Sequence, residues 1–416
     1  MNDPASAGAL WPTPSLPTPR PCPRLPARNW SCWLASTWTG DEAALLHQIE
    51  ALADSFTEEG VFEYVRLFSR VIAGLIPSFS AEELEQRYYR IRRPRRFEGD
   101  ASKVSTVFVL SRVTLGADIA VTSLALRAVL ARFPASRVVL VGGRKSRELF
   151  EGEPRLEWLP LEYARRAPLE QRLAASLRLK EQLDAPGSLV IDPDSRLTQL
   201  GLLPVCQEEH YYFFESRSWG GAGAESISSL TADWLRQTFG VGDLQPWIAP
   251  RGRISQPWAG ISVSFGVGEN LAKRVPDPFE EQLLRGLGES GLPLLIDTGP
   301  GGEEAERVRQ ALRRAKLSPA QARTFEGSFA QFALWVAASR LYVGYDSAGQ
   351  HAAAALGVPT VTIFAGFPSE RFLARWQPSG PGPKVTIRVD PPADPLVTAA
   401  RTLEAAYRLL SATEQA

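Results

Sequence analysis

The chain has 416 residues, of which 44% are hydrophobic and 22% charged, a composition typical of a soluble globular protein with two domains. Lys plus Arg and Asp plus Glu balance at 46 each, so no net charge draws the chain to nucleic acid or to a membrane surface. Three scattered cysteines without a CxxC pair argue against a disulfide framework and against structural zinc. They indicate a reducing, cytoplasmic compartment.

The first part of the chain, residues 1–38, is rich in proline and shows neither helical nor strand periodicity. This composition predicts a disordered leader. It lacks a basic start followed by a continuous apolar run, so we do not expect a signal peptide. The prolines and tryptophans of the leader suit docking to a protein partner.

A helical extension is predicted over residues 39–100. Apolar residues recur at spacings of three and four from residue 45 to residue 56, and again from 61 to 72. Ser80, with Glu83 three residues later, is the capping box of a third helix.

That third helix ends in the one basic patch of the sequence, RYYRIRRPRR at 87–96. The first interpretation is a solvated helix end. The second is peripheral contact with anionic lipid at the inner face of a membrane, and nucleic-acid binding is a distant third.

An alternation of strands and helices begins near residue 101 and predicts a parallel sheet with right-handed crossovers. The segments are a strand at 104–111, a helix at 118–133, a strand at 137–143, a helix from about 146, a helix at 167–183 and a strand at 188–195. We expect residues 101–240 to form one Rossmann-like domain.

A second alternation follows a Gly- and Pro-containing linker at 241–258. Its segments are strands at 259–266, 292–299, 341–346 and 360–366, with helices at 277–289, 303–314, 329–338 and 349–356. The predicted fold class is therefore α/β, with a second doubly wound domain over 259–393. The amphipathic helix in 394–416 is expected to cross back onto the first domain.

The stretch Leu341–Pro359, LYVGYDSAGQHAAAALGVP, predicts a strand, a tight turn and a helix suited to an anion. Asp346 and Ser347 offer N-cap chemistry, and the free amides and positive end of the helix dipole stabilise a phosphate. His351 lies in the first turn, within reach of the same anion.

These residues resemble the donor-diphosphate element of heptosyltransferase-type glycosyltransferases (family 9), which have the GT-B architecture of two Rossmann-type domains. In that family an Asp-Thr-Gly turn is followed by a His five residues after the Asp. Here Asp346 and His351 keep the spacing, and Ser347 and Ala348 stand for Thr and Gly. The resemblance implies that the turn Asp346–Gly349, including Gly349, binds the donor together with His351.

A second stretch, SFGVGENLAKRVPDPFEEQ, resembles the family's strand-loop-helix with a Lys before Trp-Pro; Val275 replaces the aromatic residue. The resemblance implies that Lys273 neutralises the charge that builds on the departing nucleotide. It also implies that Glu303 corresponds to an acid that contacts the donor ribose. Without the resemblance, Lys273 reads as a surface lysine and His351 as a packed histidine.

A third stretch, SRVTLGADIAVTSLALRAV, resembles the family's Gly-Asp turn before a helix, although Ala117 intervenes between Gly116 and Asp118. The resemblance implies that Asp118 is the general base that takes the proton of the acceptor hydroxyl. The alternative is that Asp118 only caps the helix.

The resemblance implies an inverting, metal-independent enzyme that moves a sugar, a heptose being one candidate, from a nucleotide-diphosphate donor to a glycan or lipid-linked glycan. No cofactor is expected. The alternative is a non-catalytic GT-B scaffold that serves as a binding or assembly subunit, and a third interpretation is a nucleotide-sugar epimerase.

Three further motifs stay open. Asp192-Pro193-Asp194 has the form of a metal-binding Asp-x-Asp, but its place at a strand end favours a polar strand terminus that lines the acceptor site. The aromatic segment 208–223 is either an acceptor loop or packing between domains. Gly266-Val267-Gly268 is half of a dinucleotide fingerprint without the third glycine, so NAD binding is disfavoured.

Overall fold

The computed structural model describes residues 48–49, 51–163, 167–268, 270–299 and 301–414. The chain divides into two compact units, residues 1–48 and residues 49–416, and every element named here belongs to the second. The leader predicted over 1–38, with the first turns of the helical extension, lies outside the described residues.

The helical extension contains α3 (Glu58–Leu75) and α4 (Ala81–Ile91). The predicted capping box is confirmed, because Ser80 Oγ accepts from the Glu83 amide and the Glu83 carboxylate accepts from the Ser80 amide at 3.1 Å. Both reciprocal bonds satisfy amides that the helix itself leaves unpaired.

The periodicity that placed Phe56 on a helix is misleading at this residue. The helical turn before it ends at residue 53, and Phe56 adopts a left-handed backbone with φ of 55°. Thr57 then caps α3, its Oγ1 accepting from the Gly60 amide at 3.0 Å. Phe56 is nevertheless fully buried, so the apolar pattern reports its burial rather than its conformation.

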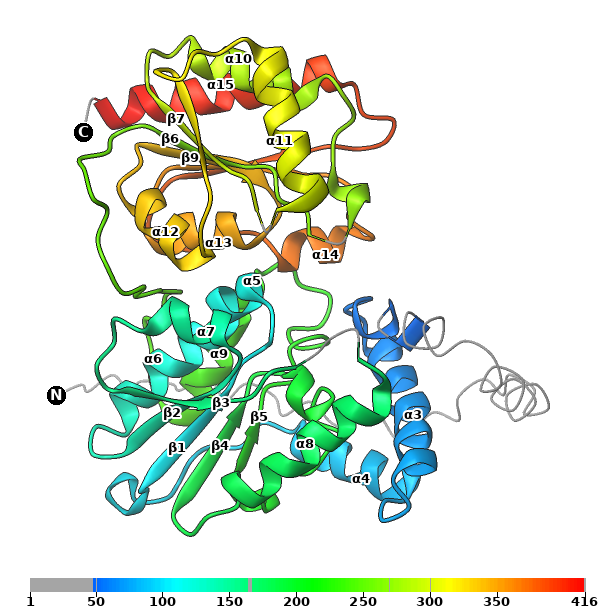
Figure 1. Cartoon of the computed structure of the whole chain (residues 1–416). Helices are drawn as coiled ribbons and strands as arrows, with labels where there is room; N and C mark the ends of the chain where they lie inside the picture. The colour runs from blue at the N-terminus through cyan, green and yellow to red at the C-terminus, as the bar shows by residue number, and fades with distance from the viewer. Residues whose placement is uncertain (1–47, 50, 164–166, 269, 300, 415–416) are drawn as a thin grey trace, which may run out of the picture. The chain divides into compact units, whose positions relative to one another are not determined.

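The N-terminal lobe, residues 101–240, is a five-stranded parallel sheet covered by helices on both faces (Figure 1). Its elements are η1 (Ala101–Lys103), β1 (Thr106–Leu110), α5 (Leu115–Ala117), the π-helical turn η2 (Asp118–Thr122), α6 (Ser123–Arg132), β2 (Arg137–Gly142), α7 (Arg144–Phe150), β3 (Leu156–Pro160), α8 (Leu169–Leu183), β4 (Ser188–Asp192), η3 (Arg196–Thr198), η4 (Glu208–His210), β5 (Tyr211–Phe213) and α9 (Ile227–Phe239). The strand order is β3-β2-β1-β4-β5, and Val107 lies opposite Val138 on one side and Leu189 on the other.

The C-terminal lobe, residues 259–414, is a six-stranded parallel sheet that is likewise covered on both faces (Figure 1). Its elements are β6 (Ile261–Ser264), η5 (Leu271–Lys273), α10 (Phe279–Gly288), β7 (Leu294–Asp297), α11 (Gly302–Ala315), β8 (Ala322–Phe325), α12 (Phe329–Ala337), β9 (Leu341–Tyr345), α13 (Ala348–Ala355), β10 (Thr360–Phe364), α14 (Glu370–Arg375), β11 (Lys384–Arg388) and α15 (Pro395–Glu414). The strand order is β11-β10-β9-β6-β7-β8.

Both lobes are wound in the same way. The first strand, β1 or β6, is central; the chain first adds two strands on one side and then returns to the other. This reversal creates a switch point between β1 and β4, and another between β6 and β9. Ligands of open α/β sheets bind beyond the carboxyl ends of the strands at such points. The fold class predicted from the sequence is confirmed.

Two further segments differ in how well they match expectation. The linker over 241–258 has no helix or strand, as predicted, and packs on the N-terminal lobe, where Trp247 Nε1 donates to the Ser123 carbonyl at 2.7 Å. The last helix, α15, does not meet the expectation of a return to the first lobe. Its buried residues join the core of the C-terminal lobe, where Leu409 and Leu410 pack with α10 and the strands.

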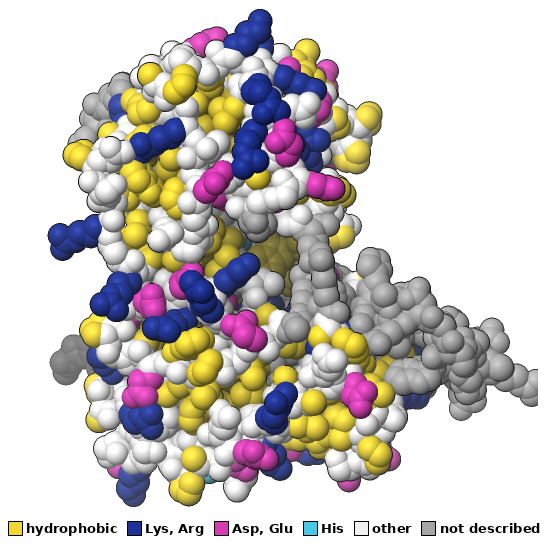
Figure 2. Space-filling view, in the orientation of Figure 1, with side chains coloured by type: hydrophobic (Ala, Val, Ile, Leu, Met, Phe, Trp, Pro, Cys, Tyr) yellow, Lys and Arg dark blue, Asp and Glu magenta, His cyan; other side chains and the backbone are white. Residues whose placement is uncertain are grey.

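Charged side chains of both signs are interspersed on the face of the molecule in Figure 2, with apolar atoms between them. This agrees with the zero net charge of the sequence. Among the described helices, none is long and apolar enough to cross a bilayer.

Candidate functional site

The turn between β9 and α13 lies at the switch point of the C-terminal lobe. Ser347 is the N-cap in an extended conformation (φ −157°), but its side chain makes no capping hydrogen bond. Ala348 then begins α13 and Gly349 follows in its first turn. The Ser347 side chain therefore leaves the amides in the first turn of α13 uncapped. Such amides favour the binding of an anion.

Glycine is required at position 349 by close packing. A Cβ added there would lie 2.0 Å from the hydroxyl of Tyr342, which is fully buried on β9. The alanines at 352–354 are buried as well. As the sequence predicts, small residues let α13 lie directly against the sheet.

Lys273 lies at the same turn. Its Nζ is 2.5 Å from Asp346 Oδ2 and 3.3 Å from the Asp346 carbonyl, and Asp346 Oδ1 accepts from Gln350 Nε2 at 2.6 Å. The Lys273 side chain is 18% exposed and that of Asp346 is 7% exposed. Burial raises the pKa of Asp346, although the Lys273 ammonium opposes this effect. The structure thus brings together the predicted lysine and the predicted turn, with Asp346 orienting the lysine rather than capping the helix.

His351 projects from α13 into a buried environment. Its ring is edge-on to Trp376 at 5.9 Å, and a Cβ on Gly116 of the N-terminal lobe would lie 3.3 Å from its Cδ2. Burial, with a smaller contribution from Lys273, lowers the pKa of His351 to about 3. The imidazole is therefore neutral at physiological pH and can act as a hydrogen-bond donor or acceptor, but not as a cation.

We expect His351→Gln to make the protein less sensitive to acid. Between pH 6.5 and about 3 the unfolded chain binds a proton at this residue that the native state does not, so stability falls as the pH falls through this window. For one such group the free energy of unfolding changes by about 1.4 kcal/mol per pH unit. Urea unfolding of wild type and variant from pH 7 to pH 5 measures this pH dependence of stability.

The control is His210→Gln, which makes the same substitution at a half-exposed histidine outside this site. A His351→Gln protein with the same loss of stability in acid as wild type would show that His351 is protonated in the native state.

Glu303 and its neighbour Glu304 occupy different environments at the start of α11. Glu303 is exposed, whereas Glu304 is half-buried, with Oε1 3.1 Å from the position of a Cβ on Gly266. Burial raises the pKa of Glu304 and also that of Asp297, at the end of β7. Glu304 and Asp297 therefore face the end of β6 more closely than the predicted ribose ligand Glu303 does. Asp297 could have been noticed in the sequence, because it ends an apolar strand.

Asp118 lies in η2 and is fully buried. It is not the N-cap of the helix, because the helix begins earlier, at Leu115, with Thr114 as its N-cap. Four donors converge on the carboxylate: the Arg112 amide at 2.7 Å and, at 2.5 to 3.0 Å, the hydroxyls of Ser111, Thr122 and Ser146. Burial raises the pKa of Asp118, and these hydrogen bonds oppose the effect. The carboxylate holds the β1–α5 loop to α7, and its role as a base stays a prediction.

The motif Asp192-Pro193-Asp194 forms two buried networks at the end of β4. Asp192 accepts from Thr198 Oγ1 and Tyr211 Oη, both at 2.5 Å, and burial raises its pKa to about 6. Asp194 lies 3.1 Å from Arg217 and 3.8 Å from Arg112, and it accepts from Ser216. Both carboxylates are committed to internal partners, so they hold the loops of the N-terminal lobe together.

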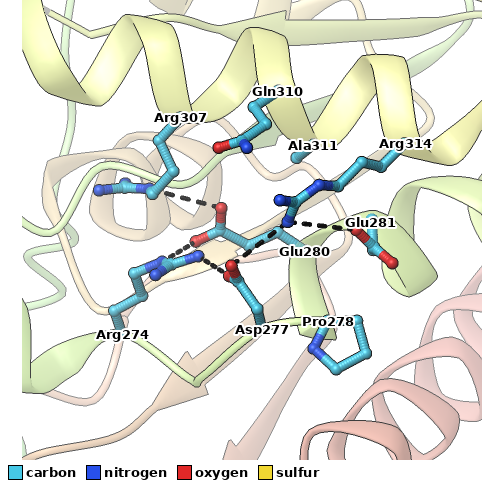
Figure 3. Close-up of a pocket in the computed structure, with 9 residues that line it drawn as sticks. All are labelled: Arg274, Asp277, Pro278, Glu280, Glu281, Arg307, Gln310, Ala311 and Arg314. Carbon is cyan, nitrogen blue, oxygen red and sulfur yellow. Dashed lines mark hydrogen bonds and ion pairs between the residues drawn. The ribbon is translucent and has the colours of Figure 1, made fainter.

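A solvent-open pocket of about 230 Å³, which includes space at its mouth, lies between the start of α10 and α11, directly after Lys273 in the chain (Figure 3). Its three arginines are paired with acids: Arg274 with Asp277 and Glu280, Arg307 with Glu280 at 3.4 Å, and Arg314 with Asp277 and Glu281. Because each of these arginines has an acidic partner, the ion pairs that line the pocket hold the loop that carries Lys273.

The basic patch at 87–96 is largely occupied by internal contacts. Arg87 donates to the Gly201 carbonyl, Arg90 pairs with Glu208, Arg92 contacts Glu58 and Glu215, and Arg95 donates to the carbonyls of residues 208, 209 and 211. The cluster therefore attaches the helical extension to the N-terminal lobe, whereas Arg93 and Arg96 are exposed.

The described residues contain no group of three or more His, Cys, Asp or Glu side chains placed to hold a metal ion. Two aromatic residues that sequence reasoning did not single out, Phe372 and Trp376, lie beside Lys273 and His351. The Phe372 ring centroid is 5.4 Å from Lys273 Nζ. Their signal in the sequence is weak, because RFLARW reads only as a short amphipathic helix.

No protein-family model matches this sequence, and no curated protein sequence does. Among solved structures, the chain is similar to a family 9 glycosyltransferase from Veillonella parvula (TM-score 0.56, 15% identity, 74% of this chain and 98% of that chain). It is also similar to E. coli ADP-heptose LPS heptosyltransferase II (TM-score 0.50, 18% identity, 74% and 99%). A third similar structure is E. coli heptosyltransferase WaaC with ADP (TM-score 0.53, 15% identity, 73% and 99%).

These identities are low, so the likeness concerns the fold. It spans nearly the whole length of each of the three proteins and leaves about a quarter of this chain unmatched. The chain has the GT-B fold, a pair of Rossmann-type domains, that solved heptosyltransferase-type glycosyltransferases of family 9 share.

Proposed function

We propose that the chain is an inverting glycosyltransferase that moves a sugar from a nucleotide-diphosphate donor to a hydroxyl of a glycan or lipid-linked glycan, without a metal. The observation that supports this most directly is the placement of Lys273 on the turn that begins α13. A fixed cation and a helix N-terminus at one point are the groups that stabilise a departing diphosphate.

The donor diphosphate binds the amides of the Asp346–Gly349 turn, and Lys273 turns from Asp346 to the phosphate oxygens. His351, neutral at its lowered pKa, contributes a hydrogen bond. Asp118 accepts the proton of the acceptor hydroxyl as that oxygen attacks the anomeric carbon and the nucleotide leaves from the opposite face. For this step Asp118 must exchange one of its four internal donors for the acceptor hydroxyl.

An adenosine diphosphate donor is the first candidate, and a heptose the first candidate sugar, because two of the similar structures are described with ADP or as ADP-heptose enzymes. We place the reaction in the cytoplasm, where nucleotide sugars are made. If the acceptor is lipid-linked, it reaches the enzyme at the inner face of the membrane.

We expect one of ADP, UDP, GDP or CMP to stabilise the protein, with the same shift in the presence of EDTA and of Mg²⁺. A ligand at 100 times its dissociation constant adds about 2.7 kcal/mol. Thermal unfolding detects the shift, and isothermal titration gives the affinity. Lys273→Ala should remove the ligand-induced shift, because the cation at the turn is lost.

Each variant is compared with its own ligand-free unfolding temperature, since Lys273→Ala also leaves Asp346 without its ion pair. The matched control is Lys145→Ala, which removes an exposed lysine on α7 and should keep the full shift. If no nucleotide stabilises the wild-type protein, or if Lys273→Ala responds as wild type does, the proposed donor site is wrong.

A second candidate function, a non-catalytic scaffold, is favoured by two specific observations. Lys273 is already neutralised by Asp346, and every oxygen of the Asp118 carboxylate is engaged by internal donors. A nucleotide that binds but is never turned over with any glycan acceptor would support this candidate. Conversion of a nucleotide sugar without an acceptor would instead indicate an epimerase.

A further inference from the structure

A short segment of the helical extension contacts both lobes. We call residues 54–57 the strap. Asp54 Oδ1 accepts from Arg217 Nη1 of the N-terminal lobe at 2.7 Å. Two residues later, the Phe56 ring lies 6.0 Å from Phe372 and 6.4 Å from Trp376, both of the C-terminal lobe and edge-on to it. The strap therefore ties α14 to the N-terminal lobe.

The two aromatic residues that Phe56 contacts cover the groups assigned above to the diphosphate. Phe372 lies over Lys273, while Trp376 packs on His351 and its carbonyl accepts from Gln350 Nε2 at 3.3 Å. Lys273 is 18% exposed and His351 only 3% exposed. A nucleotide cannot reach groups buried to this extent unless α14 moves.

A second set of contacts holds α14 from its other side. The Arg375 guanidinium is fully buried and donates to the carbonyls of Glu225 at 2.7 Å and Trp219 at 3.0 Å. Arg371 donates to the Gly221 carbonyl. These bonds go to main-chain oxygens of residues 219–225 in the N-terminal lobe, so α14 is held at the strap and at this loop.

Of the two attachments, the strap is the weaker. Asp54 is 43% exposed, which screens its ion pair with Arg217. Phe56 holds a left-handed backbone with φ of 55°, which is strained for an L-residue with a bulky side chain. Arg375, by contrast, is buried with three carbonyl partners. A contact that is strained and partly solvated is the one that opens first.

We propose that the strap is an autoinhibitory contact: Phe56 holds α14 closed over Lys273 and the first turn of α13, and its withdrawal admits the nucleotide. This proposal rests on the proposed function for the identity of the ligand. It gives the helical extension a role at the site.

The test uses the full chain and the variant Phe56→Ala, with Phe62→Ala as the matched control. Phe62 belongs to the same extension, on α3. It is 36% exposed and contacts only Tyr89 and Arg92 among the ring and cation contacts of the described residues. Hydrogen exchange of a peptide over 369–377 reports on α14 without any ligand. We expect exchange there to rise tenfold or more in Phe56→Ala and to stay at the wild-type rate in Phe62→Ala.

ADP, UDP and GDP are then titrated into the same proteins to measure their affinities. Because affinity is reduced by the fraction of molecules that are closed, the nucleotide that binds wild type should bind Phe56→Ala at least tenfold more tightly. Asp54→Asn, which weakens the other end of the strap and leaves the buried ring in place, should move both measurements in the same direction. It also keeps the test decisive if Phe56→Ala fails to fold.

Unchanged exchange of 369–377 in both strap variants would overturn the proposal. So would faster exchange with an unchanged affinity for a nucleotide that wild type binds, and this result would leave the proposed function intact. Faster exchange with no nucleotide bound by any variant would overturn the proposed function instead, while the strap would remain as the contact that holds α14.

Discussion

Asp118→Ala is expected to lower the free energy of unfolding by about 3 kcal/mol or more, whereas Asp118→Asn should leave it close to wild type. Alanine removes the acceptor of four donors, and each buried donor without a partner costs about 1–3 kcal/mol. Asparagine keeps one oxygen for the Arg112 amide and for Thr122. Its amide can donate to the hydroxyl of Ser146, which can also accept. Urea unfolding of both variants measures the difference.

Turnover of Asp118→Asn then separates the two roles of this residue. If the carboxylate is the base, a folded Asp118→Asn protein should lose about 10²–10⁴-fold in kcat while its nucleotide affinity is retained. Unchanged turnover in the folded variant would assign Asp118 to loop structure alone. The matched control is Asp100→Ala, which removes an exposed cap of η1 and should change neither kcat nor the nucleotide affinity.

The second large effect is expected from Asp194→Asn. This carboxylate lies between two buried arginines, Arg217 at 3.1 Å and Arg112 at 3.8 Å, and burial lowers the pKa of Arg112 to about 10. Breaking a buried ion pair by removing one partner costs about 3–5 kcal/mol, because the remaining charge stays in a poorly solvated place. Urea unfolding should show this loss.

Asparagine suits this position because Asp194 has φ of 68°, a left-handed conformation that Asn tolerates well. The loss therefore reports on charge rather than on the backbone. Glu157→Gln breaks the exposed pair with Arg137 on β2 and β3 and should leave stability unchanged within error. Equal effects of the two variants would show that the buried network contributes no more than a surface pair.

The sequence predicted the central strands well and missed the edges of the sheets. The runs at 104–111, 188–195, 259–266 and 341–346 correspond to β1, β4, β6 and β9, which are covered on both faces and are therefore continuously apolar. The four strands without a prediction, β3, β5, β8 and β11, are the outer strands of their sheets. β3, β8 and β11 are partly exposed and mix polar with apolar residues, while β5 has only three residues.

The candidate site could be predicted only where each of its parts follows a strand as a local motif. Lys273, Asp346 and His351 come together because loop and helix follow β6 and β9, which are adjacent strands. Phe56, Phe372 and Trp376 belong to segments more than 300 residues apart, and no local pattern reports that they meet. One partner of Asp118, Ser146, is equally hidden, because it lies on another helix.

The attachment of α14 to residues 219–225 has a consequence for how this loop can change. Arg375 and Arg371 donate to main-chain oxygens there, and Arg375 also lies 4.0 Å from the Glu225 carboxylate, so most of the attachment goes through the backbone. Gly220 and Gly221 set this path, because their φ values are 79° and 57°, and a Cβ on Gly220 would lie 2.6 Å from the Leu230 side chain. The attachment therefore depends on the path of the loop backbone, and Gly220 and Gly221 are the positions at which a substitution should disturb it.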